Sequence, residues 1–174
     1  MLDERTKKLR RELMPVVIIE HHKMFNPNLS TYDICDLLGG VWEEIEKEAE
    51  FKKSNFSAEY ILEINNRLCS SLNMSPGTFE NAEKWDDFVD SCGCVEEDPD
   101  HVLNWIFSSL YWTRLTKLRL ATSWIFINGI RIQYGFPKLI MPIENIGRFL
   151  DSLSGSGPPI YDGQTFYIET YCET

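Results

Sequence analysis

The side chains best suited to chemistry gather between residues 80 and 101 of the chain. Cys92-Gly93-Cys94 offers two thiolates to a metal ion, with His101 as a possible third ligand. Structural zinc sites usually need a second pair of ligands at a defined spacing, and the sequence has none. We therefore predict no metal site and no cofactor, and we interpret the pair as two thiols in a loop. Whether Cys92 and Cys94 bind a metal stays open at this stage.

Signatures of catalysis are missing as well. His21 and His22 are adjacent, whereas two metal-binding histidines on one helix face lie three or four positions apart. The chain has no His-Glu-x-x-His motif, no Gly-x-Ser-x-Gly turn and no glycine-rich loop ending in Gly-Lys-Ser/Thr. We predict no catalytic residue, and therefore a protein that is not an enzyme.

A change of charge near residue 100 is the strongest functional signal. The stretch from residue 80 to 100 is rich in carboxylates and contains a single lysine, Lys84. Acidic surfaces steer basic partners toward them. We predict that the partner-binding surface consists of Glu80, Glu83, Asp86, Asp87, Asp90, Glu96 and Glu97.

The next stretch, residues 101–138, has no Asp or Glu and combines cations with aromatic residues. Such a combination is typical of surfaces that stack bases and track a nucleic-acid backbone. The alternative nucleic-acid site comprises Trp112, Arg114, Lys117, Arg119 and Arg131. Aromatic residues at helical spacing more often form a core with cations at its rim, so we favour the core and keep nucleic-acid binding as the alternative.

Composition and charge narrow the class of protein. A chain of 174 residues with 43% hydrophobic residues fits one globular domain, and a net charge of -10 disfavours general binding to nucleic-acid phosphates. The charged N-terminus is unlike a secretory signal, and no apolar run has the roughly 20 residues that span a membrane. We therefore predict a non-enzymatic intracellular module, in the cytoplasm or nucleus, that binds and regulates a protein with a basic surface.

Helical patterns dominate the first part of the chain, residues 1–75. The pattern predicts helices over residues 3–13 and 16–25, separated at Pro15, because proline removes a helical hydrogen bond. Ser30 is a good N-cap for a helix whose apolar stripe consists of Ile34, Leu37, Leu38, Val41, Trp42 and Ile45. Gly39-Gly40 inside this helix suggests close approach of another backbone. Further helices are expected from Ser57 and after Thr78.

The second part, residues 76–174, is predicted to contain a central buried helix and a small sheet. Apolar residues occur nearly all round from Val102 to Leu120, as in a fully buried helix. Asn128-Gly129 and Asp162-Gly163 are hairpin-turn signals flanked by apolar residues, and a helix is expected over residues 142–153. The predicted fold is α+β: a helical N-terminal body, a central helix and a C-terminal antiparallel sheet of two hairpins.

Residues 12–68 contain a segment that resembles the HMG box. In that family an Asn-Pro-x-Leu-Ser turn precedes an Ile, a Leu-Gly pair and a Trp. The matching residues are Asn26-Pro27, Leu29-Ser30, Ile34, Leu38-Gly39 and Trp42. The resemblance implies an L-shaped arrangement of three helices. It does not imply DNA bending, because acidic residues stand where the family carries basic ones, and no DNA-binding residue is carried over.

Overall fold

The computed structural model describes residues 1–21, 28–51, 57–80, 82–91 and 115–140. Within these ranges the chain forms helices and no strand element. The helices are α1 (Glu4–His21), α2 (Thr31–Phe51), α3 (Ala58–Ser71), α4 (Ala82–Ser91) and α6 (Arg119–Gln133). The predicted α+β fold is therefore wrong for the described part. The predicted helix over 142–153 and the hairpin at Asp162-Gly163 lie outside the described residues.

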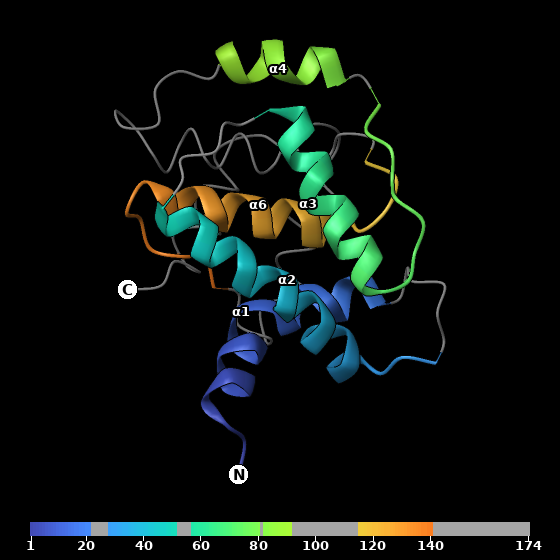
Figure 1. Cartoon of the computed structure of the whole chain (residues 1–174), viewed down its shortest axis with the longest axis vertical. Helices are drawn as coiled ribbons and strands as arrows, with labels where there is room; N and C mark the ends of the chain where they lie inside the picture. Colours follow the sequence, from blue (N-terminus) through green and yellow to red (C-terminus); the bar gives the residue numbers. More distant parts are fainter. Residues whose placement is uncertain (22–27, 52–56, 81, 92–114, 141–174) are drawn as a thin grey trace.

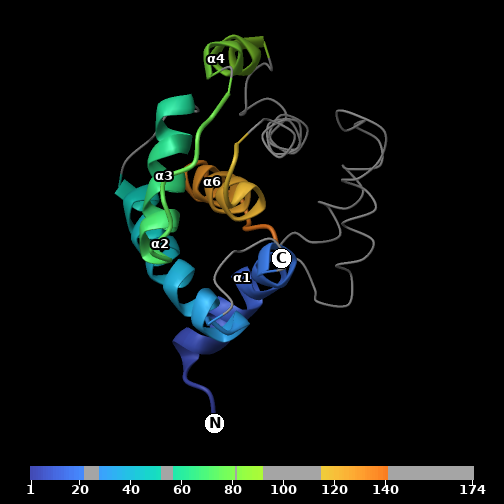
Figure 2. The ribbon, with the colours of Figure 1, turned by 90° about the vertical axis from the view of Figure 1, so that its right-hand side faces the viewer.

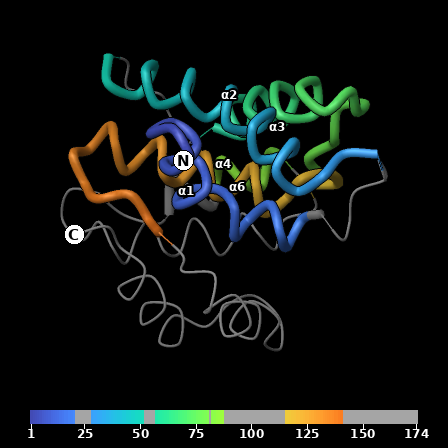
Figure 3. The backbone as a smooth tube through the Cα atoms, turned by 90° about the horizontal axis from the view of Figure 1, so that it is seen from below, coloured from blue at the N-terminus to red at the C-terminus, as the bar shows by residue number. Residues whose placement is uncertain are grey.

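Helix α6 occupies the middle of the described structure. Helices α1, α2 and α3 all contact it, and α4 contacts α3 at one end (Figure 1). From the side, α2 and α3 stand together on one side of α6, and α1 lies below α6 and also contacts α2 (Figure 2). Seen from below, α2 and α3 run together as one layer with α1 and α6 beneath them (Figure 3). One hydrophobic core joins these elements.

The segment predicted to be the first hairpin is this central helix. Every residue from Leu120 to Arg131 is buried, so packing on several sides overrides the strand preference of its many isoleucines. Asn128 does not turn the chain: its side-chain amide bonds both backbone groups of Leu139, accepting from the N–H at 2.7 Å and donating to the C=O at 3.5 Å. A Cβ on Gly129 would lie 3.3 Å from Ile45, so this glycine permits close packing of α2 on α6.

The segment before α6 was predicted to be the central buried helix. The expected span was Val102–Leu120, of which residues 102–114 lie outside the described residues. Leu115 to Leu118 precede α6 without being helical, and Leu118 has a left-handed backbone, with φ of 49°. The helix therefore begins only at Arg119.

Helix α1 runs unbroken through Pro15, contrary to the predicted separation into two helices. Leu13, Val16 and Val17 on either side of the proline are buried against the core. The apolar contacts around Pro15 outweigh the one backbone hydrogen bond that proline cannot make.

Helix α2 begins as predicted. Ser30 Oγ accepts from the Asp33 N–H at 3.1 Å, and the Asp33 carboxylate accepts from the Ser30 N–H at 3.2 Å, a reciprocal cap. The predicted stripe is buried except for Leu37, which is 40% exposed. At Gly39 the close neighbour is the Leu9 side chain rather than a backbone, and Gly40 has nothing within 4 Å of where its Cβ would stand.

Helix α3 has a side-chain cap at its start, and two aromatic residues near α4 are buried. Ser57 Oγ accepts from the Tyr60 N–H at 3.2 Å and caps α3, as the sequence predicts. Phe79 and Trp85 are buried, as predicted for the helix after Thr78, and meet edge to face with ring centroids 6.0 Å apart. The Phe88 and Val89 side chains, also predicted to be buried there, lie outside the described residues.

Candidate functional site

The described members of the predicted acidic surface lie on α4 and just before it. Glu80, Glu83, Asp86 and Asp87 are all exposed to solvent. The Asp90 side chain and residues Glu96 and Glu97 lie outside the described residues. The four described carboxylates therefore occupy the end of the molecule that α4 forms in Figure 1.

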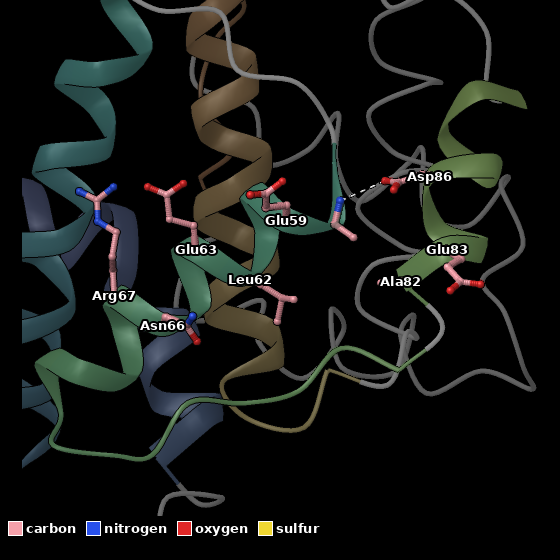
Figure 4. A pocket seen from close by; sticks show the side chains of 9 residues that line it. Glu59, Leu62, Glu63, Asn66, Arg67, Ala82, Glu83 and Asp86 are labelled. Atoms are coloured by element: carbon pink, nitrogen blue, oxygen red, sulfur yellow. Dashed lines mark hydrogen bonds between the residues drawn. The ribbon is translucent and has the colours of Figure 1, made fainter.

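Glu83 and Asp86 line a groove between α3 and α4, which we call the α3–α4 groove (Figure 4). It is open, has a volume of about 770 Å3 and has a mostly apolar lining. The lining residues are Ala58, Glu59, Leu62, Glu63, Asn66, Arg67, Ala82, Glu83 and Asp86. A volume of this size lies within the range of binding pockets, about 300–1,000 Å3.

Helical periodicity explains the wall that α3 contributes. Its lining residues form two rows, and within each row the residues are four positions apart. One row is Ala58, Leu62 and Asn66, and the other is Glu59, Glu63 and Arg67. Positions four apart share a helix face. The opposite stripe of α3, with Ile61, Ile64 and Leu68, is buried. Core packing thus turns Glu59 and Glu63 outward along the groove.

Among the described residues, the groove lining carries more carboxylates than cations. Four carboxylates and one guanidinium line it, a net charge of -3. The guanidinium of Arg67 points to α2, where it pairs with Glu44 at 2.7 Å and Glu48 at 3.1 Å. Partial burial lowers the pKa of Arg67, but its bonds to these two carboxylates outweigh that and raise the pKa overall. Arg67 is therefore committed to α2.

Several carboxylates on α2 form ion pairs with nearby cations. On α2, Glu43 pairs with Arg5 at 2.6 Å, and Glu46 pairs with Lys8 and with Lys138. By contrast, no ion pair within the described structure involves Glu59, Glu63 or Glu83. Glu50 on α2 is likewise exposed and makes no such pair. At the groove, however, three such carboxylates line one site, and a cationic partner would relieve the repulsion among them.

Asp86 has a structural task in addition to its charge. Its Oδ1 accepts a hydrogen bond of 3.1 Å from the backbone N–H of Ala58, in the first turn of α3 (Figure 4). A carboxylate at a helix N-terminus also complements the helix dipole. This bond links α4 to α3 and so helps to hold the two walls of the groove in place.

Residues of the alternative nucleic-acid site are dispersed. Arg131 is 2% exposed and bonds the carbonyl of Pro137, and Lys117 Nζ donates to the carbonyl of Ser75 at 2.9 Å. Arg119 is half-buried at the start of α6. Trp112 and Arg114 lie outside the described residues. The structure does not gather the described cations into one exposed surface.

Two further interior carboxylates were not singled out by sequence. Glu12 is 5% exposed, accepts from the Trp42 indole N–H at 2.8 Å and pairs with Lys138. Glu20 is 4% exposed, and its Oε1 accepts from the Ala121 N–H at 2.9 Å in the first turn of α6. Both stabilise packing of α1 on its neighbours, and neither faces the groove.

Asn65 is a third interior polar group, and it is fully buried. Its side chain donates to the carbonyl of Lys117 at 2.7 Å and to Thr122 Oγ1 at 3.1 Å, and it accepts from the Gly77 N–H at 3.2 Å. These bonds tie α3 to the chain on both sides of α4 and to α6. Asn65 therefore links α3 to α6 and to the chain segments before and after α4.

The predicted surface did not include Glu59 and Glu63, because the carboxylate run at 80–100 is denser. The signal that identifies them is their spacing: they lie four apart on the face of α3 opposite its apolar stripe. Their neighbour Leu62, an apolar residue on that polar face, was the second signal.

The described ranges contain neither a metal-binding cluster nor a membrane-spanning helix. No group of three or more His, Cys, Asp or Glu side chains there is arranged to hold a metal ion. Cys92, Cys94 and His101 lie outside them. None of the described helices is long and apolar enough to cross a lipid bilayer.

The HMG-box resemblance of residues 12–68 stays a prediction, since nothing found tests it. No protein-family model matches the chain, and no curated protein matches it.

Proposed function

We propose that this protein is a non-enzymatic, intracellular interaction module that binds and regulates a basic partner protein through the α3–α4 groove. The observation that carries the proposal is that Glu59, Glu63 and Glu83, which make no ion pair within the described structure, surround an apolar strip. Interfaces commonly combine an apolar centre with a charged rim. Charge complementarity at that rim selects the partner and speeds its association.

An intracellular setting is supported by the thiols. Cys35 and Cys69 are both free and buried, and neither forms a disulfide. Burial raises the pKa of the Cys35 thiol to about 11 and also raises that of Cys69. Proteins in oxidising compartments more often use their cysteines as disulfides.

The described residues give less support to nucleic-acid binding. Its cations Arg131 and Lys117 are engaged with backbone carbonyls of their own chain, and phosphates would be repelled by the α3–α4 groove. We therefore favour binding of a basic protein over binding of nucleic acid.

The test uses a short oligolysine peptide as a defined probe and a variant with Glu59→Gln, Glu63→Gln and Glu83→Gln. Each lost charge removes roughly 0.5 kcal/mol of rim attraction, so the dissociation constant should rise about tenfold. Raising salt from about 0.01 M to 0.1 M shortens the Debye length from about 30 to 10 Å and should erase most of this difference. Fluorescence anisotropy of the labelled peptide measures both effects.

The matched control neutralises Asp36 and Glu50, which are exposed on α2 and do not line the groove. It should bind nearly as the wild type does. Asp86 is left intact, because its loss would also disturb α3. Equal weakening in the control and the groove variant, or no weakening in the groove variant, refutes the proposed binding site.

A further inference from the structure

We infer that the occupant of the α3–α4 groove is an amphipathic helix with an apolar stripe and basic residues on both sides of it. This inference rests on the proposed function and names the kind of partner segment. It follows from the order of side chains across the groove and from the backbone groups that the groove walls offer.

The centre of the groove is apolar. Leu62 on α3 and Ala82 at the start of α4 contribute apolar side chains, and the buried Ala58 lies one helical turn before Leu62. Leu62 is only partly buried, although it packs against the core. An apolar side chain placed over Leu62 would remove apolar surface of both partners from water, which favours association.

Both edges of the groove are negative. Glu59 and Glu63 form one edge, and Figure 4 shows Glu83 and Asp86 across from them on α4. Residues four apart on a helix are separated by about 6 Å along its axis. Cations at the same spacing on a partner helix would meet Glu59 and Glu63, while cations on its other flank would meet Glu83.

A helix fits this order better than an extended segment. Side chains of a strand alternate between two opposite faces. A strand in the groove would therefore turn one row of side chains toward it and could not place basic rows on both sides of an apolar row. A helix presents an apolar stripe bordered on two sides.

Backbone hydrogen bonding leads to the same choice. An extended segment has free N–H and C=O groups, and these need partners when they are buried. The groove walls are helices whose interior backbone groups bond within the helix, so they offer no strand edge to pair with. A helical segment satisfies its own backbone groups and enters the apolar centre without that penalty.

The experiment compares three synthetic peptides of identical composition, rich in Leu and Lys and about 18 residues long, or five helical turns. One places Leu on a single stripe with Lys on both flanks. The second shuffles the order so that Leu and Lys are spread round the helix. The third keeps the amphipathic order but uses D- and L-residues alternately, which prevents a regular helix.

The amphipathic peptide should bind at least tenfold more tightly than the other two and should gain helical circular dichroism on binding. Leu62→Ala should weaken its binding, whereas the matched substitution Leu37→Ala, at an exposed leucine on α2, should not. Thermal melts confirm that both variants are folded.

The outcomes distinguish failure of the helical occupant from failure of the acidic binding site. If all three peptides bind equally and the Glu59, Glu63 and Glu83 triple variant weakens all of them, the acidic site stands and the helical occupant is refuted. Binding that ignores Leu62 and is displaced fully by spermine would also refute the helix, in favour of simple cation binding. If no peptide distinguishes the wild type from the triple variant, the groove is not the site and both proposals fail.

Discussion

Two adjacent glycines in α2 provide a sharp test of the packing, because the structure predicts opposite outcomes for the same substitution. Replacing glycine by alanine inside a helix gains about 1 kcal/mol from backbone propensity. At Gly40 nothing lies within 4 Å of the new Cβ. We therefore expect Gly40→Ala to stabilise the protein by about 1 kcal/mol, which raises the melting temperature by roughly 2–4 °C in a chain of this size.

At Gly39 the new methyl group meets Leu9. Its Cβ would lie 2.5 and 2.9 Å from the two terminal carbons of Leu9 and 3.2 Å from Cγ. Leu9 is fully buried, so it has little room to move away. Overpacking of this kind costs about 1–3 kcal/mol, which cancels or exceeds the propensity gain. Gly39→Ala should therefore be neutral or destabilising by up to about 2 kcal/mol.

Urea unfolding of the two variants measures the difference directly, since the propensity term is common to both. A double-mutant cycle with Leu9→Ala isolates the contact: in that background Gly39→Ala should recover the stabilisation of about 1 kcal/mol. If Gly39→Ala stabilises the wild-type protein as much as Gly40→Ala does, the packing of α1 on α2 described above is incorrect.

Three further predictions concern other interactions. Asp86→Ala removes the acceptor for the Ala58 N–H and should destabilise the protein by about 0.5–2 kcal/mol in chemical denaturation; Asp86→Asn, which keeps an acceptor oxygen, should lose less, and equal losses would contradict the role of this bond. Glu12→Leu removes the buried partner of Lys138, which keeps Glu46 at 3.5 Å, and removes the acceptor of the Trp42 indole N–H, so it should cost about 1–3 kcal/mol; Glu12→Gln should lose less, and a loss below about 0.5 kcal/mol would show that these bonds contribute little. Burial, assisted by a nearby carboxylate, raises the pKa of the Cys35 thiol from 9.0 to about 11, so the thiol ionises more readily in the unfolded chain than in the folded one. Its contribution to stability is therefore complete below pH 9 and should be lost as the pH rises from 9 to 11. Cys35→Ala should make the free energy of unfolding vary less with pH over that interval, and an unchanged dependence on pH would refute this role of Cys35.

Local signals in the sequence predicted the start of most early helices. Ser30 with Asp33 and Ser57 before α3 act as caps, and the apolar stripe of α2 is buried apart from Leu37. These features depend on residues within one or two turns of each other, so the sequence alone determines them. The buried Trp85 was predicted for the same reason.

Features that depend on distant residues were not predictable in this way. Asn128-Gly129 favours a turn on its own, but Ile45 packs closely over Gly129 and Leu139 bonds both ends of the Asn128 amide. Pro15 predicts a break, but packing of α1 on α2 and α6 keeps the helix continuous. In both cases tertiary contacts outweighed a local preference.

The candidate site was predictable only in part. The acidic character of α4 is plain from composition, and Glu83 and Asp86 do line the groove. The other wall depends on which face of α3 is left uncovered once its apolar stripe packs on α6. No single segment of sequence contains that information.

The interior bonds of α1 have a consequence for how the chain must fold. Glu20 caps a residue 101 positions later, and Glu12 pairs with one 126 positions later. Contacts between such distant residues slow folding, because a long loop must close before they form. During synthesis, α1 to α3 would emerge before the helix that covers their apolar faces, so the nascent chain must shield those faces until α6 is made.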